Sequence, residues 1–69
     1  MEIADIKAIR TNWKPVTFYL ADGRKLLVKH QDFLLFSPSG ATIFVFEEPP
    51  SQNYQILDHN QIVSIERSE

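Results

Sequence analysis

The spacing of apolar residues changes at Pro15, and this change constrains the fold more than any other feature of the sequence. Before Pro15, the large apolar residues recur every three or four positions and fall within a stripe of about 120° on a helix of 100° per residue. They are Ile3, Ile6, Ile9 and Trp13. After Pro15 the apolar residues recur every second position, as in half-buried strands. The sequence therefore predicts one helix over residues 2–12, followed by strands from about residue 16 to residue 66.

Turn signals divide the second part into short strands. Asp22-Gly23 favours a tight hairpin turn, and residues 37–40 have the proline and glycine positions of a type I turn. The prolines at 49 and 50 cannot join a central ladder, so residues 48–53 form a loop. We expect a single all-β domain over residues 1–69, a small SH3-like or Sm-like barrel of five to six antiparallel strands with one N-terminal helix.

Size and composition narrow the class of protein. The chain has 69 residues, of which 43% are hydrophobic and 23% charged, and a net charge of −2. It has no cysteine, which excludes disulfides and thiolate metal sites and fits the reducing cytoplasm. No segment reads as a signal peptide or as a membrane span of about 20 apolar residues. We therefore expect a cytoplasmic protein without cofactor, and a domain this small often depends on a partner subunit.

Several predicted strands are apolar on both faces, which is more than the single interior of a small barrel can hold. Phe44 and Phe46 oppose Ile43 and Val45, and neighbouring residues 33–36 are apolar throughout. We expect the surplus to form an outer surface through which the protein self-associates, together with strand edges. The residues assigned to this interface are Leu34, Phe36, Ile43 and Val45. The alternative is a monomer in which the helix and loops cover every apolar face.

The first two-fifths of the chain resembles Hfq and other Sm-like proteins. A helix is followed by residues 14–26, in which Leu20-x-Asp22-Gly23-Arg24 carries the closest match. The resemblance implies a bent five-stranded barrel that assembles into rings and binds single-stranded RNA. Of the Lys-His pair that Hfq uses, only His59 is present, and Asp58 precedes it.

Almost the whole chain resembles a family of small uncharacterised bacterial proteins. Their shared pattern is Asp-Gly-Arg, then Val-x-His-Pro-Asp/Glu-Phe, then Ser-Pro-x-Gly, and finally Ile-Asp before a terminal strand. Residues 18–24, 28–33, 37–40 and 57–58 match it in order, with Gln31 in place of the proline. The resemblance implies a shared fold and carries no function.

Two pairs of polar residues are candidates for metal binding or catalysis. His30 and Asp32 are two residues apart and both can bind metal, but two ligands do not make a site, and we interpret His30 as a structural residue at a kink. Asp58-His59 could join a serine in a hydrolytic triad, the candidates being Ser37, Ser39 and Ser64. Such a triad requires a pocket and an oxyanion hole, so we predict a turn at Asp58 instead and a protein that is not an enzyme.

Basic and aromatic residues offer a second candidate function, the binding of single-stranded RNA. The patch would comprise Tyr19, Arg24, Lys25, Lys29 and His59. Net negative charge disfavours it, and Lys25 and Lys29 equally well line the solvent face of a strand. The leading hypothesis is a non-enzymatic binding or scaffold domain that forms a homo-oligomer. A third hypothesis is an adaptor that binds a protein partner by strand addition.

Overall fold

The computed structural model, which describes residues 1–68, contains six strands in two three-stranded antiparallel sheets, preceded by one short helix. The elements are α1 (Ile3–Lys7), η1 (Ala8–Arg10), β1 (Val16–Leu20), β2 (Lys25–Val28), η2 (Gln31–Phe33), β3 (Leu34–Phe36), β4 (Thr42–Phe46), β5 (Tyr54–Asp58), η3 (His59–Gln61) and β6 (Ile62–Arg67), where η denotes a 3-10 turn. The first sheet has the order β2-β1-β6 and the second sheet β3-β4-β5.

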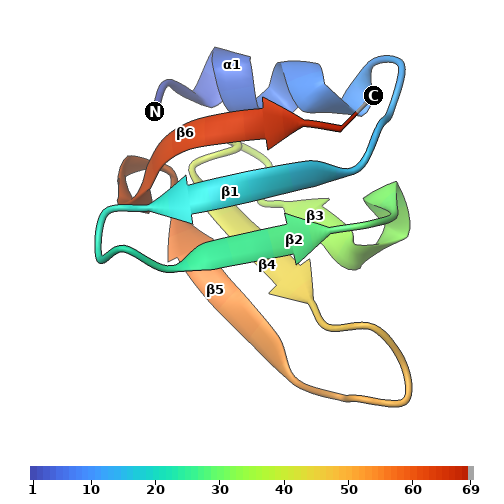
Figure 1. The fold of residues 1–69 in the computed structure, drawn as a ribbon. Coiled ribbons are helices and arrows are strands. Elements are labelled where there is room, and N and C mark those ends of the chain that lie inside the picture. Colours follow the sequence, from blue (N-terminus) through green and yellow to red (C-terminus); the bar gives the residue numbers. More distant parts are fainter. Residues whose placement is uncertain (69) are drawn as a thin grey trace.

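The predicted all-β class with an N-terminal helix is confirmed, but the sheets do not close into a barrel within residues 1–68. The 3-10 turns η2 and η3 stand at the two places where the chain passes from one sheet to the other. At these turns the backbone leaves extended geometry, so no strand runs continuously from one sheet into the other. The strands of the two sheets cross steeply, and the free end of the β4–β5 hairpin extends beyond β2 (Figure 1).

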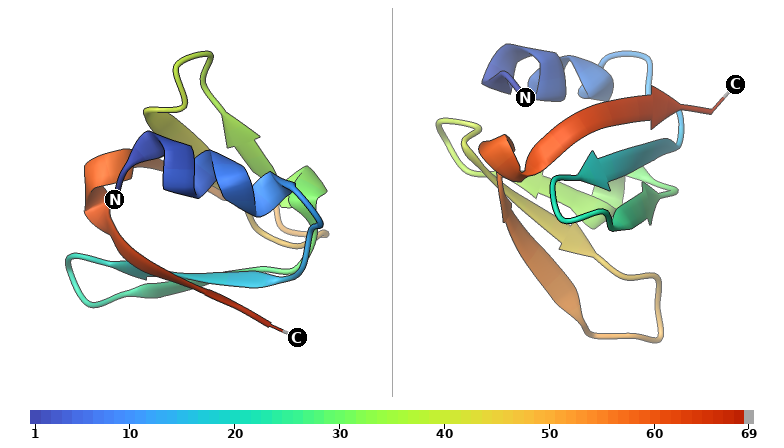
Figure 2. Two further views of the ribbon diagram at one scale, coloured as in Figure 1. Left: turned by 90° about the horizontal axis from the view of Figure 1, so that it is seen from above. Right: turned by 60° about the vertical axis from the view of Figure 1, so that its left-hand side comes forward.

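The N-terminal helix covers one open end of the space between the sheets, as the view from above shows (Figure 2). Its α-helical part is shorter than the predicted 2–12, because it tightens into η1 and ends at Arg10. Asn12 then adopts a positive φ of 52°, a conformation that asparagine tolerates better than most residues. The indole nitrogen of Trp13 donates to the carbonyl of Lys29 at 3.4 Å, which ties the segment after the helix to the end of β2.

The predicted turns form where the sequence places them. The amide of Gly23 donates to the Leu20 carbonyl at 3.0 Å, and Gly23 has a positive φ of 92°. The amide of Gly40 likewise donates to the Ser37 carbonyl at 2.8 Å. At the end of β5, the Asp58 carboxylate accepts from the Asn60 amide at 2.9 Å, which confirms the predicted turn there.

Both sheets and the helix contribute to one core. The buried hydrophobic residues are Ile6, Ile9, Val16, Phe18, Leu20, Val28, Leu34, Ile43, Val45, Leu57 and Ile62. Among the described residues no polar or charged residue is buried. The core therefore lies between the inner faces of the two sheets and under the helix, and interactions with a partner have to use the outer faces and edges.

Candidate functional site

The residues that the sequence assigned to an outer interface face the core instead. Leu34, Ile43 and Val45 are at most 6% exposed, so their assignment to an outer surface is wrong. Phe36 is half-buried, and the guanidinium carbon of Arg10 lies 5.5 Å from the centre of its ring. The helix therefore covers Phe36 as well, and none of the four is available on the outer face of a folded protomer.

The pairing of β4 with β5 explains this inversion. Ile43 is paired with Leu57, and side chains of paired residues lie on the same face of a sheet. The residues beside Leu57 are Ile56 and Asp58, and burying the face that contains Asp58 would place a carboxylate in the core. Leu57 therefore points inward, and the register carries Ile43 and Val45 inward with it.

The outer face of the second sheet is consequently apolar and exposed to water. Leu35, Phe44 and Ile56 are paired across the three strands and form one row. In the next outward-facing pair, Phe46 stands opposite Tyr54 with ring centres 5.8 Å apart. We call these five residues the outer apolar face.

Water covers much of this face in the protomer. Leu35 is 52% exposed, Phe46 38%, and Tyr54 and Ile56 each 56%, while Phe44 at the centre is half-buried. Taking about 200 Å² for each large side chain, the four exposed ones leave about 400 Å² in contact with water. This area lies within the roughly 300–600 Å² of the largest apolar patch on a typical monomer, a patch that is often functional.

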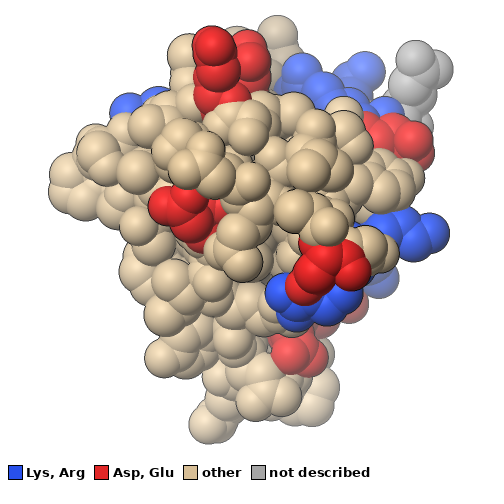
Figure 3. Space-filling model, turned by 90° about the vertical axis from the view of Figure 1, so that its left-hand side faces the viewer, with Lys and Arg blue, Asp and Glu red and all other residues tan. Residues whose placement is uncertain are grey.

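Charged residues are sparse around β5. Figure 3 views the molecule from the side on which β5 and the β1–β2 turn lie, and its lower left part carries no lysine, arginine or acidic side chain. Within the strands of the second sheet the one charged residue is Asp58, at the end of β5. A strand face whose one carboxylate stands at its end favours contact with another apolar surface.

A groove lies between β2 and the second sheet. It has a volume of about 320 Å³, and its lining residues come from β2 and its end, from η2, and from the β4–β5 hairpin. They are Leu26, Leu27, Lys29, Phe33, Val45, Phe46, Glu47, Glu48 and Gln55. The groove therefore lies along β2, an edge strand of the first sheet that is not paired with the second sheet.

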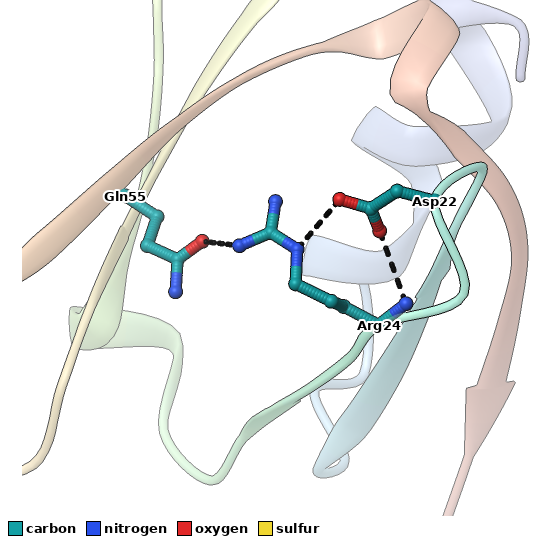
Figure 4. A network of polar contacts seen from close by, with 3 residues as sticks. All are labelled: Asp22, Arg24 and Gln55. Atoms are coloured by element: carbon teal, nitrogen blue, oxygen red, sulfur yellow. Dashed lines mark hydrogen bonds and ion pairs between the residues drawn. The ribbon is translucent and has the colours of Figure 1, made fainter.

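Two polar contacts bridge the sheets beside this groove. The Arg24 guanidinium donates to the Asp22 carboxylate at 2.7 Å and to the side-chain oxygen of Gln55 on β5 at 2.9 Å (Figure 4). Just past the end of β2, the Lys29 ammonium donates to the Glu48 carboxylate at 3.3 Å. The pKa of Asp22 lies below its ordinary value because the Arg24 amide, and then the Arg24 guanidinium, donate hydrogen bonds to its carboxylate.

The residues of the proposed RNA patch are not gathered on one surface. Tyr19 and Lys25 form a cross-strand pair, whereas Arg24 and Lys29 are directed to the second sheet. His59 lies on η3, where its Nδ1 atom is 2.9 Å from the Met1 carbonyl oxygen. Because acids neutralise Arg24 and Lys29, little positive charge is left for phosphate, and RNA binding is the weaker of the candidate functions.

The residues considered for metal binding and hydrolysis serve local structure. The His30 ring lies edge-on against Phe33, with ring centres 5.5 Å apart. Within residues 1–68 there is no group of three His, Cys, Asp or Glu residues that could hold a metal ion. Asp58 forms a capping box with Gln61 at η3.

Two of the three serines of the considered triad have local roles. Ser37 and Ser39 bond to each other and to the backbone of their own turn, and Ser64 lies on β6. These contacts hold the turn before β4 in place.

Comparisons of the chain with protein-family models, with curated proteins and with solved structures find no match. A separate finding concerns membranes. None of the helices in residues 1–68 is long and apolar enough to cross a bilayer.

Proposed function

We propose that this protein is a non-enzymatic interaction domain that self-associates by packing the outer apolar face of its second sheet against the same face of another copy. The observation that supports this proposal is the exposed row Leu35, Phe44 and Ile56. In a soluble domain, a strand face that stays in water normally carries polar residues at alternate positions. Here the outward residues of three adjacent strands are apolar except at one end, where Thr42 is paired with Asp58.

The area is of the right size for a dimer. About 400 Å² of apolar surface is half of the roughly 800 Å² that each partner buries in a standard interface, and polar residues at the rim supply the rest. Burying this surface on two copies contributes about 20 kcal/mol at about 25 cal/mol per Å². Lost rotational and translational freedom costs about 4–15 kcal/mol. The difference, about 5–16 kcal/mol, brackets the roughly 8 kcal/mol of a micromolar dissociation constant.

A twofold arrangement suits the geometry of this face. In a twofold dimer the same patch is used on both copies, so the patch must be complementary to itself. Phe44 lies on the central strand between Leu35 and Ile56, so a twofold axis near Phe44 would bring two apolar rows together. Sheets packed face to face in this way bury their side chains in a layer about 10 Å thick.

Analytical ultracentrifugation over a range of concentrations tests the proposal. The wild-type protein should form dimers at high micromolar concentration, and Ile56→Asp should be monomeric because it places a carboxylate inside the interface. Val63→Asp is the matched control, since Val63 is an equally exposed apolar strand residue on β6 of the first sheet. A wild-type protein that stays monomeric at high micromolar concentration would refute the proposal, and so would equal dissociation of both variants.

The fold and the compartment of the protein are also proposals. We propose that the domain is related to the small Sm-like and SH3-like β-domains, on the grounds that a helix precedes a hairpin built on Leu20-x-Asp22-Gly23-Arg24. A cytoplasmic location is supported by the lack of cysteine in the sequence.

A further inference from the structure

The groove beside β2 has the features of a second binding site, for an extended peptide. We propose that it binds a strand-forming segment of another protein, which adds to the first sheet beside β2. The segment would carry apolar residues at alternate positions and a lysine or arginine near one end. The groove shares Phe46 with the outer apolar face, but its other lining residues lie outside that face, and the proposal does not depend on self-association.

The backbone of β2 supplies the hydrogen-bonding groups that an added strand needs. β2 is at the edge of the first sheet, with β1 as its neighbour. The Leu20 amide donates to the Arg24 carbonyl at 2.9 Å, so residues 20 and 24 occupy a pair position of the hydrogen-bonded type, with the Arg24 amide donating to Asp22 instead. Because such pairs alternate along an antiparallel ladder, the amide and carbonyl groups of Lys25 and Leu27 point away from β1. Strand addition uses edge groups of this kind.

The groove also provides an apolar surface for the side chains of such a segment. Leu26 and Leu27 line it on the β2 side, and Val45 and Phe46 line it on the side of the second sheet. Its volume of about 320 Å³ falls at the lower end of ligand-binding clefts, which begin at about 300 Å³. Side chains on one face of a strand are two residues apart, so alternate residues of the segment would enter the groove.

The charge of the lining favours a basic residue on the bound segment. The charged residues of the groove are Lys29, Glu47 and Glu48. Lys29 is paired with Glu48, whereas the Glu47 carboxylate accepts a hydrogen bond from the Ser51 hydroxyl at 3.4 Å. The lining therefore has a net negative charge located at Glu47, where a lysine or arginine of the segment would be attracted.

Peptide titration followed by nuclear magnetic resonance tests this site. The probe is a synthetic peptide of sequence Lys-Val-Thr-Val-Thr-Val, and the protein is the full chain carrying Ile56→Asp, so that self-association does not affect the result. We expect the amide signals of Lys25 and Leu27 to shift and their hydrogen exchange to slow. The same peptide with every backbone amide N-methylated has no N–H donor on either edge, so it cannot form the ladder and should not bind. Absence of shifts at millimolar peptide, or equal binding of the N-methylated peptide, would overturn the proposal.

A charge exchange at Glu47 tests the preference for a basic residue. Glu47→Lys should weaken binding of the lysine peptide about threefold, the range of an exposed ion pair, and should strengthen binding of the matching Glu-Val-Thr-Val-Thr-Val peptide. Glu66→Lys makes the same change on β6, outside the groove, and should alter neither affinity to this extent. Equal responses of the two variants would contradict a role for Glu47. Because every protein in this series carries Ile56→Asp, the result is independent of whether the wild type dimerises.

Discussion

Ile43 lies directly opposite Leu57 in the β4–β5 ladder, and both side chains are completely or almost completely buried. The next pair along the same ladder, Phe44 and Ile56, faces away from the core. Adjacent positions on these strands thus differ in role. One pair lies in the core that stabilises the fold, and the next belongs to the proposed interaction surface. Substitutions at adjacent positions should therefore have different consequences.

Ile43→Ala should lower the free energy of unfolding by about 2–5 kcal/mol, because it leaves a cavity in the core. Ile56→Ala should change it by about 0.5 kcal/mol or less, since this side chain is exposed in the protomer. Urea unfolding at low micromolar concentration, where association does not contribute, measures both values. Equal losses for the two variants would show that the register of β4 and β5 differs from the one described.

The sequence was sufficient to predict those elements whose two faces differ in polarity. β1 alternates Val16, Phe18 and Leu20 with Thr17 and Tyr19, so its period and its buried face were both evident. Residues 33–36 and 42–46 are apolar on both faces, and nothing within these strands decides which side is inner. The orientation of β4 follows from its pairing with β5, and that of β3 from its pairing with β4.

The candidate sites depend on long-range contacts in the same way. The groove joins β2, η2 and the β4–β5 hairpin, which are separated in the sequence and are brought together by the crossing of the two sheets. No local pattern contains this information. A usable signal for the outer apolar face was present in β5, where Tyr54, Ile56 and Asp58 share one face and the aspartate marks that face as the solvated one.

The two glycines in turns should respond differently to alanine. Both have positive φ, 92° at Gly23 and 82° at Gly40, so each alanine variant is strained by about 1 kcal/mol. At Gly40 an added Cβ would also lie 2.6 Å from Lys7 Cε and 2.7 Å from Ile3 Cγ2 on the helix. At Gly23 nothing lies within 4 Å.

Gly40→Ala should therefore lower the melting temperature more than Gly23→Ala does. Gly23→Ala serves as the control for the backbone strain alone. Thermal unfolding followed by circular dichroism compares the two variants. Equal shifts would mean that the helix does not pack closely on the turn before β4.

The capping box at η3 should contribute measurably to stability. The Asp58 carboxylate accepts from the Asn60 amide, and the Gln61 side chain accepts from the Asp58 amide at 2.7 Å. Asp58→Ala removes the first contact and should cost about 1 kcal/mol, as for other lost N-terminal caps. Asp58→Asn keeps an acceptor oxygen and should recover most of the loss in urea unfolding. Equal stability of the alanine and asparagine variants would refute the role of the cap.

The hydrogen bonds that Asp22 accepts in the β1–β2 turn should make stability depend on acid pH. The pKa of Asp22 is held below its ordinary value of 3.8, first by the Arg24 amide and then by the Arg24 guanidinium. A carboxyl group whose pKa is lower in the folded state stabilises the fold above its unfolded pKa, and this contribution is lost as pH falls through the folded value. Wild type should therefore lose stability below about pH 3.8 relative to Asp22→Asn.

The Arg24→Ala variant separates the two causes of this shift. It removes the guanidinium but retains the backbone amide at position 24, which donates to the Asp22 carboxylate at 3.0 Å. Because this amide is the larger cause, the pKa of Asp22 should rise only part of the way to its ordinary value. A carbon-detected titration of the Asp22 carboxyl group measures it in both proteins. A complete return to the ordinary value in Arg24→Ala would show that the guanidinium, and not the turn backbone, holds the proton off Asp22.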